Sequence, residues 1–290
     1  MTEKKWYKRA WLRWLTALAV VLVPVAWWLS GYYHENYVAA AAEPFYHIPP
    51  AHDDDTLRVI IVGDSWAEIH MRLNCDTIFR QYAAQMTQQP VTCWSRGKGG
   101  AMSKEIYHFM FSRLTEEHPW EPDRSTQPLI ESHPDYCVLF AGINDAIFQR
   151  STAYSAGNYQ LMLRLLLHHG IRPVVMEIPM VDAASAIDYK VWHKRSAYHL
   201  KAWILGTRGN QVPQYREAIS RMLDETGLRD SVLFIPANRW NPGGWRDTTM
   251  FTYDRIHLNI DGYHKLDSCI VAEILKDKVR LAEILKDKGR

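Results

Sequence analysis

Short apolar runs rich in β-branched residues alternate along the chain with longer stretches of helical character. The runs lie at 57–62, 91–94, 136–141, 174–178 and 232–235. Each run has the length of a strand and few polar positions, which is typical of strands buried on both faces of a parallel sheet. The pattern predicts the α/β class, as a three-layer, doubly wound sandwich with a five-stranded parallel sheet.

Helices are expected between these strands and after the last one. The first follows strand 57–62 as far as about residue 86, and the others lie at 103–117, 158–169, 214–225 and 262–276. Two segments interrupt the alternation. Residues 118–134 are rich in proline and charge, which favours an exposed loop. Residues 180–213 are longer than a simple connection and form either part of a substrate cleft or a helical excursion on the surface.

The C-terminus repeats the sequence AEILKDK, at 272–278 and again at 282–288. A shift of ten residues turns an α-helix by about 1000°, so the two copies cannot share one face. We expect the folded domain to cover 57–275 and residues 276–290 to form a solvated tail.

The N-terminus has the pattern of a membrane anchor. Residues 14–29 contain Thr16 as their only polar residue, and tryptophans and tyrosines flank them. Such a segment approaches the length of a bilayer core, with aromatic rings at both interfaces. We therefore expect a cytoplasmic basic segment at 1–13, a transmembrane signal-anchor helix at 14–33 and a linker at 34–56. A cleaved signal peptide ending at the alanine run 39–42 is the alternative.

Charge is concentrated at the same end of the chain. Residues 1–13 hold five basic residues against Glu3, and the formal charge of the whole chain is +2. The positive flank predicts a single-pass protein of the cytoplasmic membrane, with its N-terminus in the cytoplasm and its body in the periplasm or at the cell surface. The body is nearly neutral, with 29 basic residues (34 − 5) against 31 acidic ones (32 − 1). This balance argues against a nucleic-acid partner, which requires a basic face.

Four cysteines, Cys75, Cys93, Cys137 and Cys269, are widely spaced and form no CxxC pair. Zinc is therefore not expected. A Cys75–Cys93 disulfide is compatible with an extracytoplasmic location, although the sequence does not fix the pairing. No cofactor and no metal are expected, because the chain has no phosphate loop, dinucleotide fingerprint or cluster of metal ligands.

Chemically useful residues follow four of the five predicted strands. Ser65 follows the first strand in the sequence Gly-Asp-Ser-Trp, and a glycine cluster at 97–100 follows the second. Asn144 follows the third strand, and Asp254 and His257 follow the fifth. Parallel strands end at the same edge of a sheet, so these side chains are expected to meet there.

This ordered set resembles the SGNH/GDSL hydrolase superfamily over about residues 57–275. The matching blocks are GDS at 63–65, GxND at 142–145 and DxxHLNxxGY at 254–263. The glycine block matches more loosely, and its functional glycine is Gly100, with Gly99 as the alternative. Trp66 also departs from the leucine or isoleucine usual after GDS. The resemblance implies that 57–275 is a catalytic domain with no metal.

The roles that the resemblance implies are physically reasonable. His257 would take the proton of Ser65, and Asp254 would orient the imidazole. The backbone N–H groups of Ser65 and Gly100 and the side-chain amide of Asn144 would form the oxyanion hole. Asp64 and Asp145 are expected to brace loops. Among the aromatic residues, Trp66, Trp94, Trp240 and Trp245 are candidates either for packing or for stacking on a sugar.

The expected function is that of a serine esterase using an acyl-serine intermediate. Its substrates would be acylated carbohydrates, above all O-acetyl groups of an envelope carbohydrate or glycolipid, or small esters. An O-acyltransferase that modifies an envelope polysaccharide, with a membrane acyltransferase partner, is the first alternative. A non-catalytic glycan-binding or scaffold protein is the second. The lipid bilayer is expected as a partner of the N-terminal helix.

Overall fold

The computed structural model describes residues 3–33, 52, 54–111, 125–188, 190–207 and 210–288. Most of the predicted linker at 34–56, and the N-terminal part of the predicted loop at 118–134, lie outside the described residues. The C-terminal part of that loop contains a short helix, α5 (Gln127–Glu131), packed against α4 (Ser103–Phe111).

The described chain contains a five-stranded sheet in which all neighbouring strands are parallel. The strands are β1 (Leu57–Gly63), β2 (Val91–Gly97), β3 (Tyr136–Phe140), β4 (Arg172–Met176) and β5 (Leu233–Ile235). Their spatial order is β2-β1-β3-β4-β5. This is the order of flavodoxin-like folds, which place ligands where the winding direction changes, here between β1 and β3. The predicted α/β fold with a five-stranded parallel sheet is confirmed.

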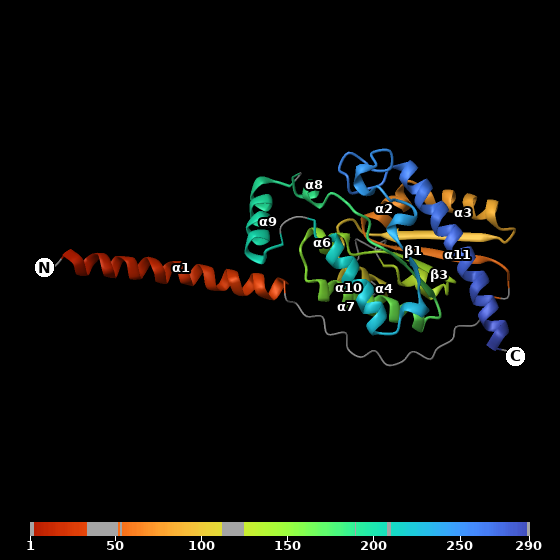
Figure 1. Cartoon of the computed structure of the whole chain (residues 1–290), viewed down its shortest axis with the longest axis horizontal. Helices are drawn as coiled ribbons and strands as arrows, with labels where there is room; N and C mark the ends of the chain where they lie inside the picture. Colours follow the sequence, from red (N-terminus) through yellow and green to blue (C-terminus); the bar gives the residue numbers. More distant parts are fainter. Residues whose placement is uncertain are drawn as a thin grey trace.

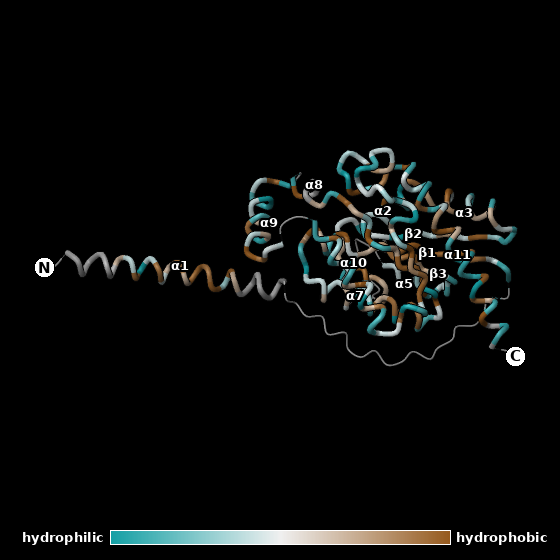
Figure 2. The backbone as a smooth tube through the Cα atoms, in the orientation of Figure 1, coloured by the Kyte–Doolittle hydropathy of each residue, from teal (hydrophilic) through white to brown (hydrophobic). Residues whose placement is uncertain are grey.

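Helices cover both faces of the sheet (Figure 1). On one side, α2 (Ser65–Arg72) and α3 (Cys75–Met86) lie against β2, and α11 (Ile260–Lys288) packs on α3. On the other side, α7 (Thr152–His168) packs between α4 and α10 (Val212–Glu225). Figure 2 shows hydrophobic residues concentrated in the strands between these layers. The central strands β1, β3 and β4 are buried almost throughout, which accounts for the apolar character of their runs, whereas the edge strands β2 and β5 are only partly buried.

The register of the central strands aligns their carboxyl ends. Gly63 at the end of β1 pairs with Gly97 of β2 and with Phe140 of β3. A Cβ atom at Gly63 would lie 2.1 Å from the Phe140 carbonyl oxygen, so only glycine allows this approach. The loops that follow β1, β2 and β3 therefore begin side by side.

Two helices differ from the sequence prediction. The helix predicted up to about residue 86 is divided into α2 and α3, because Asn74 adopts a left-handed conformation with φ of 55°. The last helix continues to Lys288, through the predicted tail. Its residue Asp277 is buried and bonds to Arg172 at 2.6 Å, so the folded domain extends past residue 275. Asp287, the equivalent residue of the second repeat, is exposed.

The segment 180–213 contains two further helices, α8 (Ala183–Asp188) and α9 (Trp192–Leu205). Helix α9 is mostly exposed, including Trp192 and Trp203, and only Ala202 is buried. The four cysteines are free thiols, so the Cys75–Cys93 disulfide that the sequence left open is not formed. The Cys93 sulfur instead lies 3.9 Å from Asp76.

The N-terminal segment forms a long helix, α1 (Glu3–Tyr33), which includes the predicted basic segment. Large apolar side chains between Trp11 and Val25 are exposed along it. Within the portion of the chain that the structure describes, no helix combines the length and apolar character needed to cross a membrane.

Candidate active site

Ser65 lies at the turn from β1 into α2 and is the first residue of that helix. The preceding residue, Asp64, caps the helix by accepting a hydrogen bond from the Trp66 N–H at 3.0 Å. The first N–H groups of a helix have no partner within it, and the helix dipole favours negative charge there. This turn therefore presents the Ser65 hydroxyl at the sheet edge beside backbone donors.

Ser65, His257 and Asp254 form one hydrogen-bonded line. His257 Nε2 lies 2.8 Å from Ser65 Oγ, and its Nδ1 lies 2.6 Å from Asp254 Oδ2. With the proton on Nδ1, the imidazole donates to the carboxylate and accepts from the serine hydroxyl. The structure thus brings together three residues from opposite ends of the domain in the arrangement that activates a serine.

Hydrogen bonds join the two ends of the loop that contains Asp254 and His257. Phe251 and Leu258 form an antiparallel bridge, and the Thr252 N–H donates to the His257 carbonyl at 2.8 Å. Asp254 Oδ1 accepts bonds from the Thr252 hydroxyl and from the backbone N–H groups of Ile256 and His257. These contacts fix the carboxylate before any substrate is bound.

The same contacts determine the charge of Asp254. Partial burial acts to raise its pKa, but hydrogen bonds from His257, Thr252 and Ile256 outweigh burial and hold the pKa well below the ordinary value. Asp254 is therefore ionised throughout the neutral range. An ionised partner stabilises the imidazolium that forms when His257 takes a proton.

The residues expected to form the oxyanion hole line one pocket. Gly100, with φ of 77°, and Asn144 line the same pocket as the serine. The Asn144 amide donates one hydrogen to the Ala101 carbonyl at 2.9 Å, which orients it and leaves its second hydrogen available. Gly100 follows the backbone turn at Lys98, whose carbonyl accepts the Ala101 N–H at 3.1 Å.

The structure also distinguishes Gly100 from Gly99. The Gly99 N–H donates to Glu68 Oε2 at 2.5 Å, so this donor is already occupied. Among the described residues, the Gly100 N–H has no hydrogen-bond partner. This assignment depends on a contact between α2 and the β2 loop, which the spacing of the glycines does not reveal.

Asp145 and Asp64 are both fully buried next to these donors. Asp145 accepts bonds from the Ser103 N–H at 3.0 Å and the Ser103 hydroxyl at 2.8 Å, which joins α6 (Ile143–Ile147), the short helix that contains Asn144, to the start of α4. Burial raises the pKa of Asp145 to about 6 and that of Asp64 to about 7. Their contacts correspond to the loop-bracing roles expected from the sequence.

The pocket around Ser65 is open and has a volume of about 440 Å³. Tyr253, which is 85% exposed, stands at its rim. Lys190 and Phe148 also line it, with the Lys190 ammonium 5.0 Å from the Phe148 ring centre. These three residues belong to no motif, so the sequence does not reveal them; Tyr253 stands next to Asp254 in the chain, whereas Lys190 and Phe148 reach the site only through tertiary packing.

A family model for the GDSL-like lipase/acylhydrolase family matches residues 61–265. The chain belongs to this family. Members of the family are hydrolases that act on ester bonds, so the protein is an enzyme of that class. No curated protein matches the chain.

Solved structures of similar fold agree with membership in the GDSL-like family. The lipase/acylhydrolase from Enterococcus faecalis is 18% identical, with a TM-score of 0.51, and the match covers 75% of this chain and 95% of that one. An acetyl xylan esterase is 19% identical, with a TM-score of 0.50 and coverage of 74% and 98%. At this level of identity, the likeness concerns the fold.

In this GDSL-like enzyme, two of the tryptophans considered for sugar stacking are core residues. Trp66 is 1% exposed, and its ring packs against Phe140, Trp240 and Phe251. Trp240 is likewise buried. Stacking on a sugar is therefore excluded for these two rings, and the tryptophan that follows Ser65 serves to fill the core beneath the site.

Proposed function

We propose that the enzyme removes ester-linked acyl groups through an acyl-serine intermediate on Ser65. The Ser65 oxygen attacks the ester carbonyl while its proton passes to His257 Nε2. The resulting oxyanion accepts hydrogen bonds from the N–H groups of Ser65 and Gly100 and from the Asn144 amide. Collapse of this intermediate breaks the ester bond, and the departing alcohol takes the proton from His257.

A second half-reaction regenerates the enzyme. His257 takes a proton from water as the water oxygen attacks the acyl-serine, and the proton returns to Ser65 when the acid leaves. The observation that carries the proposal is the line from Ser65 through His257 to Asp254, with contacts of 2.8 and 2.6 Å. The same line disfavours the alternative of a non-catalytic glycan-binding or scaffold protein.

For the substrate, we propose O-acetyl groups of an envelope carbohydrate or glycolipid. The open pocket at Ser65 admits a small acyl group on a bulky alcohol, with Tyr253 at its rim. The similarity to an acetyl xylan esterase supports this choice. Water and a sugar hydroxyl attack the same acyl-serine, so an O-acyltransferase acting with a membrane acyltransferase partner is the alternative outcome. Transfer of acetyl to an added oligosaccharide, measured against acetate release, distinguishes the two activities.

We also propose that the segment at 14–33 anchors the enzyme in the cytoplasmic membrane, with the catalytic domain outside the cytoplasm. The basic residues before the apolar segment and the exposed apolar side chains of α1 support this proposal. The mature protein should remain in the membrane fraction with residues 1–13 intact, and a C-terminal reporter should be active only outside the cytoplasm. A soluble species beginning near Glu43 would show instead that the segment is a cleaved signal peptide.

The nucleophile is tested by covalent labelling. A fluorophosphonate should label the full chain once, at Ser65, and Ser65→Ala should abolish both labelling and turnover of an aryl acetate. Ser268→Ala is the matched control, because among the described residues the Ser268 hydroxyl forms one hydrogen bond, to the Lys265 carbonyl within its own helix. Labelling of a different serine, or turnover that survives in Ser65→Ala, would remove Ser65 from the mechanism.

A further inference from the structure

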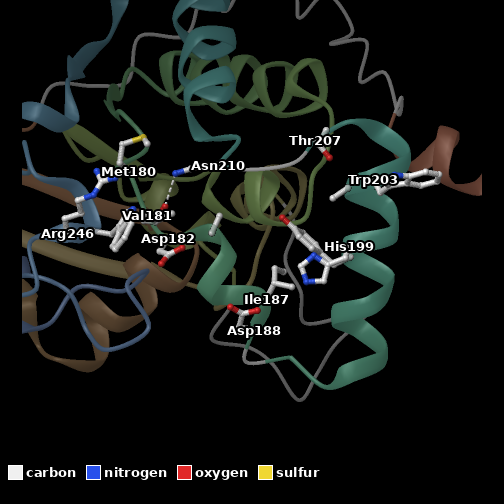
Figure 3. Close-up of a pocket in the computed structure, with 14 residues that line it drawn as sticks. Met180, Val181, Asp182, Ile187, Asp188, His199, Trp203, Thr207, Asn210 and Arg246 are labelled. Carbon is white, nitrogen blue, oxygen red and sulfur yellow. Dashed lines mark hydrogen bonds between the residues drawn. The ribbon is translucent and has the colours of Figure 1, made fainter.

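A second pocket lies between the α8–α9 segment and the loop that contains Trp245. Its volume is about 620 Å³, within the range of roughly 300–1,000 Å³ that is usual for small-molecule sites. Figure 3 shows His199 pointing from α9 toward Ile187 and Asp188 of α8, whereas Trp203 points away. The two pockets have no described lining residue in common.

The two pockets are nevertheless neighbours. Asp188 lines the second pocket and Lys190 lines the pocket of Ser65. The Cα atoms of residues two positions apart in the chain are separated by at most about 7 Å. A second connection joins Asp182 of the second pocket to the catalytic loop: its N–H donates to the Arg255 carbonyl at 3.1 Å. A ligand longer than one small group can therefore occupy both pockets at once.

The lining combines an apolar floor with hydrogen-bonding groups. Val181 and Ile187 are fully buried beneath the pocket, and Tyr198 adds an aromatic ring. Thr207 lines the pocket with a buried hydroxyl that has no hydrogen-bond partner among the described residues. A buried polar group without a partner is costly, by about 1–3 kcal/mol, unless a ligand or water satisfies it. Asp188 and His199 supply further donors and acceptors at the mouth.

This chemistry selects among the possible ligands. An acyl chain would cover the Thr207 hydroxyl without bonding to it. Arg246 also lines the pocket, but the carboxylates of Asp182 and Asp188 offset its charge, so the lining does not favour a phosphorylated or strongly acidic ligand. A pyranose has an apolar face for the floor and hydroxyl groups around its edge for the polar residues. We infer that this pocket binds a neutral pyranose unit of the glycan whose acyl ester lies at Ser65, an inference that rests on the proposed function.

Binding is measured separately from catalysis. The full chain with Ser65→Ala is titrated with xylotriose, cellotriose and chitotriose, and saturation-transfer NMR reports contact with each sugar. At least one of them should bind saturably, and adding Thr207→Val should weaken it by about 3- to 10-fold, the loss of one hydrogen bond. His199→Ala should weaken it as well. His193→Ala is the matched control, because His193 is on the same helix but does not line the pocket.

Catalysis supplies the second readout, in chains that retain Ser65. Thr207→Val and His199→Ala should raise KM for acetylated xylo-oligosaccharides and leave turnover of an aryl acetate unchanged. Absence of binding by all three sugars, or binding unaffected by both variants, would overturn the inference. A change in the enzyme's preference between aryl acetate and aryl octanoate in Thr207→Val would also overturn the inference, because the pocket would then hold the acyl chain. If Ser65→Ala retained esterase activity, the proposed mechanism would fail while the binding result still stood.

Discussion

Replacement of Asp254 by asparagine tests the tautomer on which catalysis depends. Asp254 accepts three hydrogen bonds on Oδ1, from the Thr252 hydroxyl at 2.7 Å and from the N–H groups of Ile256 and His257 at 2.9 and 3.0 Å. An asparagine can keep all three with its carbonyl oxygen. Its NH₂ group then faces His257 Nδ1, where the carboxylate now accepts at 2.6 Å. The loop should therefore fold as before, with only this last contact changed.

The changed contact should exchange the donor and acceptor nitrogens of the imidazole. Nδ1 must accept from the asparagine, so the ring proton moves to Nε2 and faces the Ser65 hydroxyl. His257 can then no longer take the serine proton. The equivalent change in serine proteases lowers kcat by about 10⁴. At about 1.36 kcal/mol for each factor of ten, this is a barrier increase of about 5.5 kcal/mol.

The assay is kcat for an aryl acetate, with thermal unfolding measured on the same samples. Asp135→Asn is the matched control: its carboxylate also accepts a backbone bond, from the Arg58 N–H at 2.7 Å, but it lies just before β3, at the opposite end of the sheet. The control should retain wild-type kcat. If Asp254→Asn kept most of the wild-type kcat with an unchanged unfolding temperature, the tautomer argument would be refuted.

The pH dependence gives an independent check. Hydrogen bonds keep the pKa of Asp254 well below its ordinary value, so this residue does not gain a proton as the pH falls from neutral to mildly acidic. Loss of kcat/KM between neutral and mildly acidic pH should therefore come from other groups, among them the buried Asp64 and Asp145, whose pKa values burial raises to about 7 and about 6. A kcat/KM profile in which the acid-side ionisation disappeared in Asp254→Asn alone would contradict this.

Further predictions concern the oxyanion hole and the core. Asn144→Ala should lower kcat by about 10²–10³ with little change in KM, because this donor acts mainly in the transition state; a change in KM alone would make it a substrate-binding residue. Gly100→Ala should cost about 1–2 kcal/mol of stability in urea unfolding, because its φ of 77° is unfavourable for alanine; an equally stable variant would contradict this. Burial acts to lower the pKa of His70, but its bonds to Asp267 and Asp76 prevail and raise it from 6.5 to about 9. Because the pKa of His70 is higher in the folded state, the stabilisation is complete below pH 6.5 and is lost as the pH rises through 9. His70→Gln should therefore lower the free energy of unfolding by about 3 kcal/mol at neutral pH and flatten its dependence on pH. An unchanged slope of unfolding free energy against pH would contradict this prediction.

The amino-acid sequence by itself determines the layers of this fold and the residues of its site. Central strands buried on both faces must be apolar at nearly every position, so the runs at 57–62, 136–141 and 174–178 mark the middle of the sheet in the sequence. Chemistry at the strand ends is also local: Ser65 begins a helix directly after β1, and Asp254 stands three residues before His257. The apolar runs and the residues at the strand ends are defined by neighbours in the chain, so they can be recognised from the sequence alone.

Only the tertiary structure decides which distant groups meet. The order β2-β1-β3 places the segments that follow β2 and β3, with Gly100 and Asn144, on either side of Ser65, and the closed loop at 251–258 brings His257 to its hydroxyl. The choice of Gly100 over Gly99 follows from Glu68, which reaches across from α2. Burial of Trp66 and the helical path of the C-terminal repeat are likewise consequences of packing. Such contacts join residues far apart in the chain, and neither periodicity nor motif spacing records the distance between them.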